Sequence, residues 1–551
     1  MVQACAKAGL VRSARDQFAL MMTGFMSRAR LTVAVAIGLF AAMIASRAHA
    51  QSTDNNEAEI ALLKQQLRSV EQKLDELQKQ TVANAHAAAA ANARAASVAG
   101  VNAATPVKGP TAPSDVVVKL PNNRPTFCTA DDQNCIAITS RLHFDAGGYD
   151  YRPNSAATVP QRLDDGVNAR RARIGVIGKL FGDWNYALIY DFAGSSDGFA
   201  STASVRGASV GFLPGGALSG IENAYLSYTG FKPFGGKLAI EGGYLDVPYT
   251  LDEATSSNDI LFLERASSQV IAANVAASDF RSAAGARWYT DSFWIGAYAT
   301  GPTAGAIHSA SSTNPNGTTE QLGAAARIAG QVVTGKDYSL HIGGDAEFLI
   351  DAPHNLVTGA QTLTLSDRPE LRLDPTTLVS TGALAGVSGA QVYSAEAAAT
   401  YGPLFFQGEY FWYKVDRGNL SGLSSVKFNG GYAQASWVLT GETHTYNSAA
   451  AAYGGIVPLN PFSLTGGGWG AWEIAGRIST IDLNDQLAAA NGVAGGRQTV
   501  YTAGLNWYIN RNVRFMFDYL HGDVARQISA INARNAGSKF DAFAMRTQVA
   551  F

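Results

Sequence analysis

The sequence predicts an all-β fold, namely a transmembrane antiparallel β-barrel preceded by a short N-terminal coiled-coil helix. From about Ile136 to the C-terminus, segments of roughly 8–12 residues alternate apolar and polar side chains and are separated by Gly, Asn, Asp and Ser turns. The chain is rich in Gly (57), Phe (25) and Tyr (21), and its charged fraction is only 16%. That fraction lies below the roughly 25% that is usual for soluble domains.

The N-terminal residues 1–50 predict a signal peptide. Arg28 and Arg30 precede an apolar run from Leu31 to Ala45, and Ala48-His49-Ala50 is a small-x-small cleavage site. The apolar run is shorter than the ~20 residues of a transmembrane helix. Residues 1–25 do not fit an n-region, so we expect translation to start at Met26, or at Met21 or Met22. Cys5 would then be absent from the exported protein.

Residues 51–81 predict a coiled coil, because their apolar side chains repeat at heptad a and d spacing. These side chains are Ile60, Leu63, Leu67, Val70, Leu74 and Leu77. The alternative is one amphipathic helix on the surface of a domain, but no domain adjoins it. Residues 82–135 form an Ala/Pro-rich linker that ends in a small loop between Cys128 and Cys135. In an oxidising compartment these two cysteines predict a disulfide; a metal or redox pair is the alternative.

Residues 136–551 predict the barrel. In the segment 513–519, Val513, Phe515, Phe517 and Tyr519 share one face, and Arg514 and Asp518 share the other. A soluble sandwich or propeller could show the same alternation. The barrel is favoured because aromatic residues gather near segment ends and because Arg, Asp and Glu occupy the polar face. Barrel closure also leaves no unpaired backbone in lipid.

One stretch departs from the alternation. Residues 251–266 read LDEATSSNDILFLERA and place hydroxyl, amide and charged side chains together without a repeat. Net charge near −2 argues against a nucleic-acid partner for the chain.

The order and spacing of several segments resemble the family of phosphate-selective porins O and P, over residues 136–551. They are NARRARIGVIGKLFGDWNYALIYDFAG (168–194), NAYLSYTGFKP (223–233), LDEATSSNDILFLER (251–265), VLTGETHTY (438–446), WGAWEIAGRIS (469–479), AGLNWYINRNVRFMFDYL (503–520) and MRTQVAF (545–551). The resemblance implies a sixteen-stranded barrel in the outer membrane, a homotrimer, short periplasmic turns and a loop folded into the lumen. The terminal Phe551 resembles the signal by which such barrels are recognised for assembly.

The resemblance also implies pore residues. Ser256, Ser257 and Arg265 match the family's constriction serines and arginine, and Glu222 matches its single constriction acid. Further arginines match the ladder that leads anions inward, namely Arg141, Arg170, Arg171, Arg173, Arg368 and Arg372. Arg173 should share the face of Arg171, because alternate strand residues point the same way.

Glu253 is the main departure from the family pattern, because it stands where relatives carry the constriction lysine. From residue 116 onward, 30 Lys and Arg face 36 Asp and Glu, a difference of −6. We therefore expect a general porin of mixed or cation-leaning selectivity without strict phosphate specificity, in which Arg265 opposes Glu253 and Glu222. The alternative is that these three residues form a salt-bridge network that only braces the loop.

The expected function is passive diffusion of small hydrophilic solutes and ions, with outer-membrane lipids as surroundings and no cofactor. One rival is a barrel that mainly anchors the coiled coil. Another is a barrel hydrolase, because Ser209 lies in a G-x-S-x-G match and His143 and His521 could assist it. A nucleophile elbow, however, needs a strand-turn-helix context.

Overall fold

The computed structural model describes residues 116–551, apart from the segments 154–161, 194–203, 206–207, 210–219, 277–279, 303–320, 356–357, 419–421 and 527–536. The expected signal peptide, coiled coil and most of the linker lie outside these residues. None of the described helices is long and apolar enough to cross a membrane.

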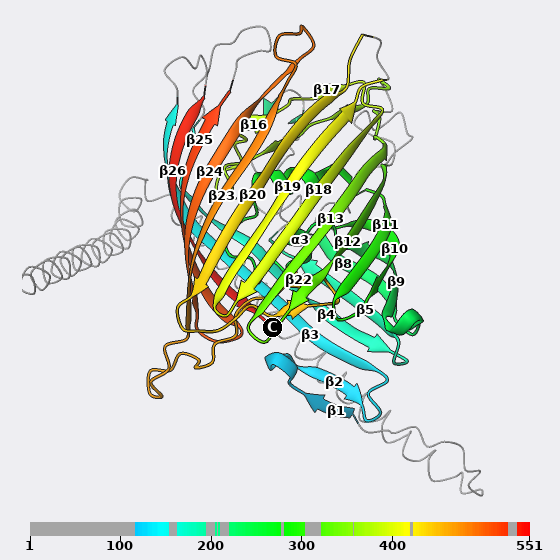
Figure 1. Ribbon diagram of the computed structural model, residues 1–551, viewed down its shortest axis with the longest axis vertical. Coiled ribbons are helices and arrows are strands. Elements are labelled where there is room, and N and C mark those ends of the chain that lie inside the picture. The colour runs from blue at the N-terminus through cyan, green and yellow to red at the C-terminus, as the bar shows by residue number, and fades with distance from the viewer. Residues whose placement is uncertain are drawn as a thin grey trace, which may run out of the picture. The chain divides into compact units, whose positions relative to one another are not determined.

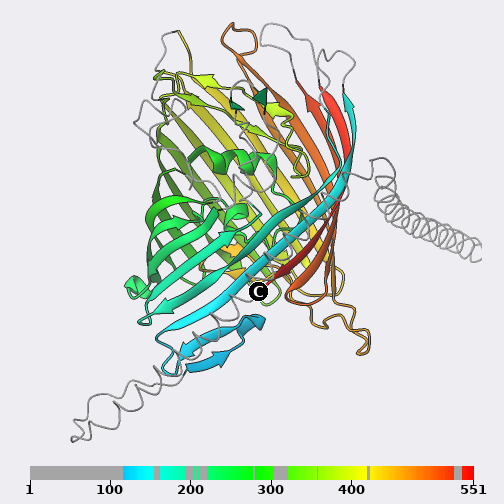
Figure 2. The same cartoon turned by 180° about the vertical axis from the view of Figure 1, so that it is seen from behind.

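The described strands form one closed antiparallel barrel, which Figures 1 and 2 show from opposite sides. Its sheet of eighteen strands comprises a small hairpin and sixteen barrel strands, so the expected barrel of sixteen strands is confirmed. Each strand pairs with the next along the chain, and β26 pairs with β3 to close the ring. The barrel strands are β3 (Cys135–Pro153), β4 (Gly166–Leu180), β5 (Trp184–Asp191), β8 (Gly220–Tyr228), β9 (Lys237–Leu245), β10 (Arg281–Tyr289), β11 (Phe293–Thr300), β12 (Leu322–Thr334), β13 (Tyr338–Asp351), β18 (Gly389–Tyr401), β19 (Leu404–Asp416), β20 (Val426–Val438), β23 (Ala471–Asp485), β24 (Val493–Tyr508), β25 (Val513–Ala525) and β26 (Ser538–Ala550).

The barrel turns its apolar face outward and its polar face inward, the reverse of a soluble β-protein. On β13, the outward Leu340 and Ile342 are 38% and 48% exposed, whereas the inward His341 and Glu347 are fully buried. Aromatic rings pack together on the outward face near strand ends, as Trp472 and Trp507 do with ring centroids 5.0 Å apart. Both features suit a wall that meets lipid.

The two rims of the barrel differ. At the rim where β26 ends, most described connections are short turns, such as 181–183, 290–292, 335–337 and 402–403. We call it the C-terminal rim, and its short turns are those expected at the periplasmic end of an outer-membrane barrel. The opposite rim carries long connections. One connection breaks the pattern: residues 439–470 join β20 to β23 at the C-terminal rim, so the expectation of uniformly short periplasmic turns is wrong here.

Three segments fold into the lumen. The inward loop (residues 246–276) follows β9 and contains α3 (Leu251–Ala254) and α4 (Ser267–Ala276). A second loop (residues 358–388) follows β13, and an inner arm (residues 444–455) rises from the C-terminal rim. They carry the short strands β14 (Thr362–Leu363), β15 (Ser366–Asp367), β16 (Val379–Ser380), β17 (Leu384–Ala385), β21 (Tyr446–Asn447) and β22 (Ala452–Tyr453).

The largest apolar cluster lies inside the barrel and joins these loops to the wall. It packs Leu263 and Ile271 of the inward loop with Leu371 of the second loop and with wall residues such as Phe411. The lumen is therefore partly a packed core rather than an open tube.

A hairpin precedes the barrel at the C-terminal rim. Strands β1 (Val116–Lys119) and β2 (Thr126–Thr129) pair, and β2 pairs with the start of β3. Between them, the short turn η1 (Pro121–Asn123) contacts the β24–β25 turn through an Asn123–Asn512 hydrogen bond of 2.7 Å. The remaining elements are β6 (Ser204–Val205), β7 (Ala208–Ser209) and the turn η2 (Pro233–Gly235).

Candidate functional site

The inward loop holds the stretch LDEATSSNDILFLERA. Thr250 begins α3 as its N-cap, where its side chain accepts a hydrogen bond from the Glu253 N–H. Asp252, Glu253 and Ser257 are buried, whereas Ser256 is exposed. The loop lies close to the wall, because a Cβ at Gly504 of β24 would stand only 3.1 Å from the Phe262 ring. This polar stretch therefore crosses the lumen and does not lie outside the barrel.

Buried carboxylates hold the inward loop by its backbone. Each accepts hydrogen bonds from peptide N–H groups that would otherwise be unpaired. The pairs are Asp345 with Thr250 (3.0 Å), Glu409 with Leu251 (2.7 Å) and Asp252 (3.1 Å), Asp518 with Leu263 (2.8 Å) and Glu370 with Ser267 (2.9 Å). Charge-assisted bonds of this kind are roughly twice as strong as neutral ones. Much of the acid excess of the barrel region therefore serves to fasten the loop.

One cavity of about 290 Å³ lies between the inward loop and the wall formed by β3, β4, β5, β8 and β10. It collects most of the side chains that the sequence singled out. Its charged and hydroxyl lining residues are Thr139, Ser140, Arg141, Arg171, Arg173, Glu222, Asp246, Glu253, Ser256, Ser257, Arg265 and Arg287. Five arginines and three carboxylates therefore line this one cavity.

Three of the lining arginines, Arg173, Arg287 and Arg265, have carboxylate partners. Arg173 contacts Glu222 and also Asp191, the latter at 2.8 Å. Arg287 contacts Glu241 at 3.0 Å. These pairs neutralise much of the local charge.

Arg265 does not stand opposite Glu253, as we expected, but beside it. Its Nε lies 3.5 Å from the Glu253 carboxylate and 3.9 Å from Asp252. Its guanidinium also donates to the backbone oxygens of Asp252 and Thr255. The two residues sit on one short loop, so a field between them cannot span the pore.

Arg141 and Arg171 differ from the others, because in the described part of the chain no carboxylate lies within 4.0 Å of either guanidinium. Arg141 donates to the hydroxyls of Ser257 (2.6 Å) and Ser256 (3.3 Å), which ties the wall to the loop. Arg171 is 2% exposed and approaches His143 Nδ1 at 3.5 Å. These two residues give the cavity its excess positive charge.

A β-bulge explains why Arg170 and Arg171 are both buried inside. The register of β3 and β4 shifts between His143 and Phe144, so two consecutive residues face the lumen. Arg170 does not line this cavity, however. Its guanidinium forms two hydrogen bonds with the Glu264 carboxylate, Nε to Oε1 at 2.6 Å and Nη2 to Oε2 at 2.8 Å. Alternation alone could not have placed both side chains.

The expected arginines of the second loop also stand away from the cavity. Arg372 contacts Asp367 at 3.0 Å and lies 3.8 Å from Glu264, and Arg368 is buried in the same loop. Arg372 thereby links the second loop to the inward loop.

The Glu264 carboxyl is the centre of that bracing. Burial by itself raises its pKa, but Arg170 and Arg546 hold the pKa well below its usual range. The nearby Asp252 differs, because burial outweighs Arg265 and raises its pKa. Glu264 therefore stays ionised in the lumen.

Asp246, Asn223 and Arg287 line the cavity although the sequence did not point to them. Arg287 could have been found, since it follows the inward face of an alternating strand. Ala450 belongs to the inner arm, which is distant from the inward loop in the sequence. No local sequence pattern could have placed it at the cavity.

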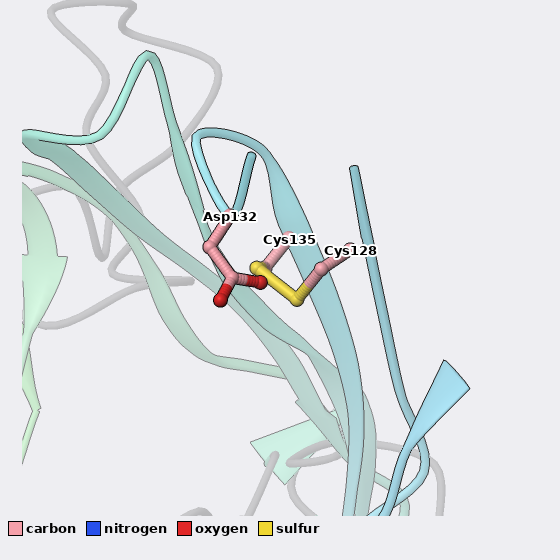
Figure 3. Close-up of side chains that lie close together, drawn as sticks. All are labelled: Cys128, Asp132 and Cys135. Atoms are coloured by element: carbon pink, nitrogen blue, oxygen red, sulfur yellow. A yellow bond between two sulfur atoms is a disulfide. The ribbon is translucent and has the colours of Figure 1, made fainter. Parts of the chain in front are cut away.

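Cys128 and Cys135 face each other on β2 and β3, and their sulfur atoms are bonded (Figure 3). Asp132 lies beside them and bonds Lys119 at 2.6 Å. Because both sulfurs are used in the disulfide, neither can serve as a thiolate ligand for the alternative metal site.

Ser209 lies in β7, which pairs with β6, and the next described element is strand β8 rather than a helix. His143 bonds Asn258 inside the lumen, whereas His521 bonds Asp541 at 2.7 Å and is partly exposed. The structure does not bring these histidines together as a base–acid set. Phe551 pairs with Ser140 through its backbone N–H and C=O groups at the barrel seam.

The chain is similar to several known proteins. Porin O of Pseudomonas aeruginosa is 25% identical over 458 residues, which cover 80% of this chain and 93% of that protein. An uncharacterized protein of Caulobacter vibrioides is 28% identical over 471 residues, covering 84% and 83%. Among solved structures, OmpT, an outer membrane protein of Vibrio cholerae, has a TM-score of 0.43 and 12% identity over 76% of this chain and 98% of its own.

The sequence profile of one family spans the whole barrel. The family is described as "Phosphate-selective porin O and P", and the match covers residues 136–551. That range begins at the first residues of β3 and ends at the C-terminal Phe551. The chain therefore belongs to the phosphate-selective porin O and P family and is a channel-forming β-barrel of the outer membrane.

Proposed function

We propose that this porin lets small hydrophilic solutes diffuse across the outer membrane and that it favours small anions only weakly, without strict phosphate specificity. The observation that carries the proposal is the cavity at the inward loop, where five arginines face three carboxylates. Pores select by lining charge, donor geometry and diameter. A small positive excess in a water-filled lumen attracts anions without holding them tightly.

The acid excess of the whole barrel region does not argue for cation selectivity. Asp345, Glu409 and Asp518 accept backbone N–H groups of the inward loop, so their charge is screened from the solute path. This supports the mixed form of the expected selectivity rather than the cation-leaning form.

Glu253 is the reason for proposing weak rather than strict anion preference. In the family pattern a lysine ammonium stands at this position, and here a carboxylate replaces it beside Arg265. That exchange removes one cation and adds one anion in the lining of the cavity. Arg141 and Arg171 remain as the uncompensated cations.

Ion selectivity of the purified pore in planar bilayers tests the proposal. In a tenfold KCl gradient, we expect a reversal potential that reports a chloride-to-potassium permeability ratio above one but below about ten, the ratio that ~1.4 kcal/mol sets. Phosphate at low millimolar concentration should leave the chloride current unblocked. A strongly chloride-selective pore, or a current blocked by micromolar phosphate, would contradict the proposal.

We also infer that the protein is a homotrimer, which its family supports. Native mass spectrometry of the purified barrel in detergent checks this inference, and a monomer as the dominant species would refute it.

A further inference from the structure

The connection between β20 and β23 has an outer part that differs from most of the described turns of the C-terminal rim, because it is long and uncharged. Residues 457–470 read VPLNPFSLTGGGWG and contain no charged residue. We call them the outer arm. By contrast, the turn 335–337 on the same rim is Gly-Lys-Asp, and the turn 290–292 contains Asp291. The outer arm is therefore a long uncharged segment on a rim where most of the described turns carry a charged residue.

The base of the outer arm packs on the outside of the barrel at the C-terminal rim, and the connection that carries it extends beyond the strand ends there (Figures 1 and 2). The Phe462 ring packs against Trp507 with centroids 5.3 Å apart and planes at 85°. Trp507 points outward, since its neighbour Asn506 points inward and donates to Leu261 of the inward loop. The arm thus continues the outward aromatic surface and does not enter the lumen as the inner arm does.

Indole hydrogen bonds fasten the base of the outer arm to that surface. The Trp507 and Trp472 Nε1–H groups both donate to the Trp469 carbonyl oxygen, at 2.9 and 3.2 Å. The Phe462 N–H also donates to the Ile509 oxygen at 2.8 Å. Because Trp472 and Trp507 stack on each other, the arm rests on a rigid aromatic platform.

The outer arm nevertheless leaves its large apolar side chains uncovered. Leu464 is 91% exposed, Trp469 is 73% exposed and Leu459 is 72% exposed. Gathered apolar exposure of this kind marks a surface that meets a partner or a membrane. Tryptophan in particular favours the boundary between headgroups and acyl chains.

We propose that the outer arm is a membrane anchor that inserts Leu464 and Trp469 into the periplasmic leaflet of the outer membrane. Its occupant is the phospholipid surface, because the arm is continuous with the lipid-facing ring of Trp472 and Trp507 and carries no charge that would resist burial among headgroups. The anchor is independent of the ion selectivity proposed above. It would hold the C-terminal rim at a set depth while the inner arm of the same connection stays in the lumen.

Site-directed spin labelling tests this anchor in the full chain reconstituted into phospholipid vesicles. A nitroxide at Leu464→Cys is compared with one at Lys336→Cys on the charged turn of the same rim, both in a Cys5→Ser background. Cys128 and Cys135 are joined and do not react. Because Leu464 is almost fully exposed, the label should leave the fold unchanged, which retained heat-modifiability on gels would verify.

The expected result is that oxygen relaxes the Leu464→Cys label more than a water-soluble nickel chelate does, with the opposite order at Lys336→Cys. Equal nickel accessibility at both sites would overturn the proposal, because the arm would then stand in water. Dipolar broadening that disappears on dilution with unlabelled chain would also overturn it, since the arm would then rest on another copy of the protein.

Discussion

At the scale of single residues, the charge of a side chain in this pore is decided by its partners as much as by its type. Glu253 lies 3.5 Å from Arg265 and accepts a hydrogen bond from Gln269 at 2.7 Å, so only part of its negative field reaches a solute. Arg171 has no such carboxylate partner in the described chain. We therefore expect substitutions of Glu253 and of Arg171 to change the ion selectivity in different ways.

Glu253→Lys should raise anion selectivity. The substitution changes the local charge by two and restores the cation of the family pattern, and unit charges about 4 Å apart interact by ~1 to ~4 kcal/mol as the effective dielectric constant falls from ~80 to ~20. Reversal potentials in a KCl gradient measure the shift. Glu253→Gln is the matched control, since it keeps the Gln269 contact and should move the ratio by about half as much. If both variants kept the wild-type chloride-to-potassium permeability ratio, Glu253 would serve only to brace the inward loop.

Arg171→Gln should lower the chloride-to-potassium ratio by about fivefold, which corresponds to ~1 kcal/mol for one charge in a water-filled pore. The same measurement on Arg170→Gln provides the control. Arg170 is paired with Glu264 away from the cavity, so its loss should disturb the loop more than the selectivity. Equal selectivity shifts in the two variants would show that the unpaired guanidinium of Arg171 has no special role.

At the scale of elements, the inward loop is held by charged groups on several strands rather than by its own secondary structure. Its helix α3 is short, and Glu409 of β19 accepts the N–H groups of Leu251 and Asp252 at its N-terminus. A carboxylate from a distant strand thus does the work of a local cap. The position of the inward loop is therefore set by side chains of the barrel wall that bind its backbone.

Glu409→Gln should loosen the loop, because an amide oxygen and an NH₂ group cannot accept both N–H bonds. A lost cap costs about 1–2 kcal/mol, enough to raise the population of displaced loops several-fold. Single-channel recordings should show added open-channel noise and a wider spread of conductance. The control is Asp541→Asn on the β26 segment near the opposite rim, which does not contact the loop. Recordings with no more noise than those of the wild type would contradict the inference that Glu409 holds the inward loop in place.

The Glu264 cluster predicts how the loop responds to acid. Because Arg170 and Arg546 depress the folded-state pKa below the ordinary value of 4.5, the ion pairs contribute stability above pH 4.5 and lose it as the pH falls through the lower, folded-state pKa. Conductance should therefore stay constant from pH 7 to pH 5 and change only in stronger acid. Glu264→Gln should be noisy already at pH 7, since Arg170 and Arg546 both lose the Glu264 carboxylate, although Arg546 keeps its pair with Asp145. A wild-type transition near pH 6 would disprove this assignment.

At the scale of the whole molecule, the lumen is narrowed from both rims. The inner arm is pinned by Arg327, which donates to the Ala450 and Ala451 oxygens at 2.8 Å, and by the Trp294 indole, which donates to Ala449 at 3.0 Å. Ala450 also borders the cavity at the inward loop. The periplasmic connection is therefore part of the pore.

Replacing residues 444–455 by a short Gly/Ser link should raise single-channel conductance and admit larger sugars in liposome-swelling assays, because the arm then no longer occupies the lumen. Replacing residues 459–468 of the outer arm by a link of the same kind should leave conductance unchanged, since that part lies outside the barrel. Equal conductance in both replacements and the wild type would show that the inner arm does not limit flow.

Much of the barrel could be read from the sequence, because strand alternation is a local property. The period-two pattern of residues 513–519 predicted an apolar outward face, and Val513 to Tyr519 adopt it in β25. The stretch 251–266 stood out because its polar residues do not alternate. Ser256, Ser257 and Arg265 were matched through the family motif and meet in one cavity.

The alternation of apolar and polar residues is enough to predict a transmembrane antiparallel barrel, since a repeated two-residue period and a polar inner face leave little other choice in lipid. Which charges are available to a solute depends instead on contacts that form only in the folded chain. Arg170 and Arg171 adjoin in sequence, yet a bulge turns both inward and Glu264 neutralises one of them. The carboxylates that make the barrel acidic bind loop N–H groups from strands far apart in the chain. Such pairings depend on distance in space, which composition and periodicity do not contain.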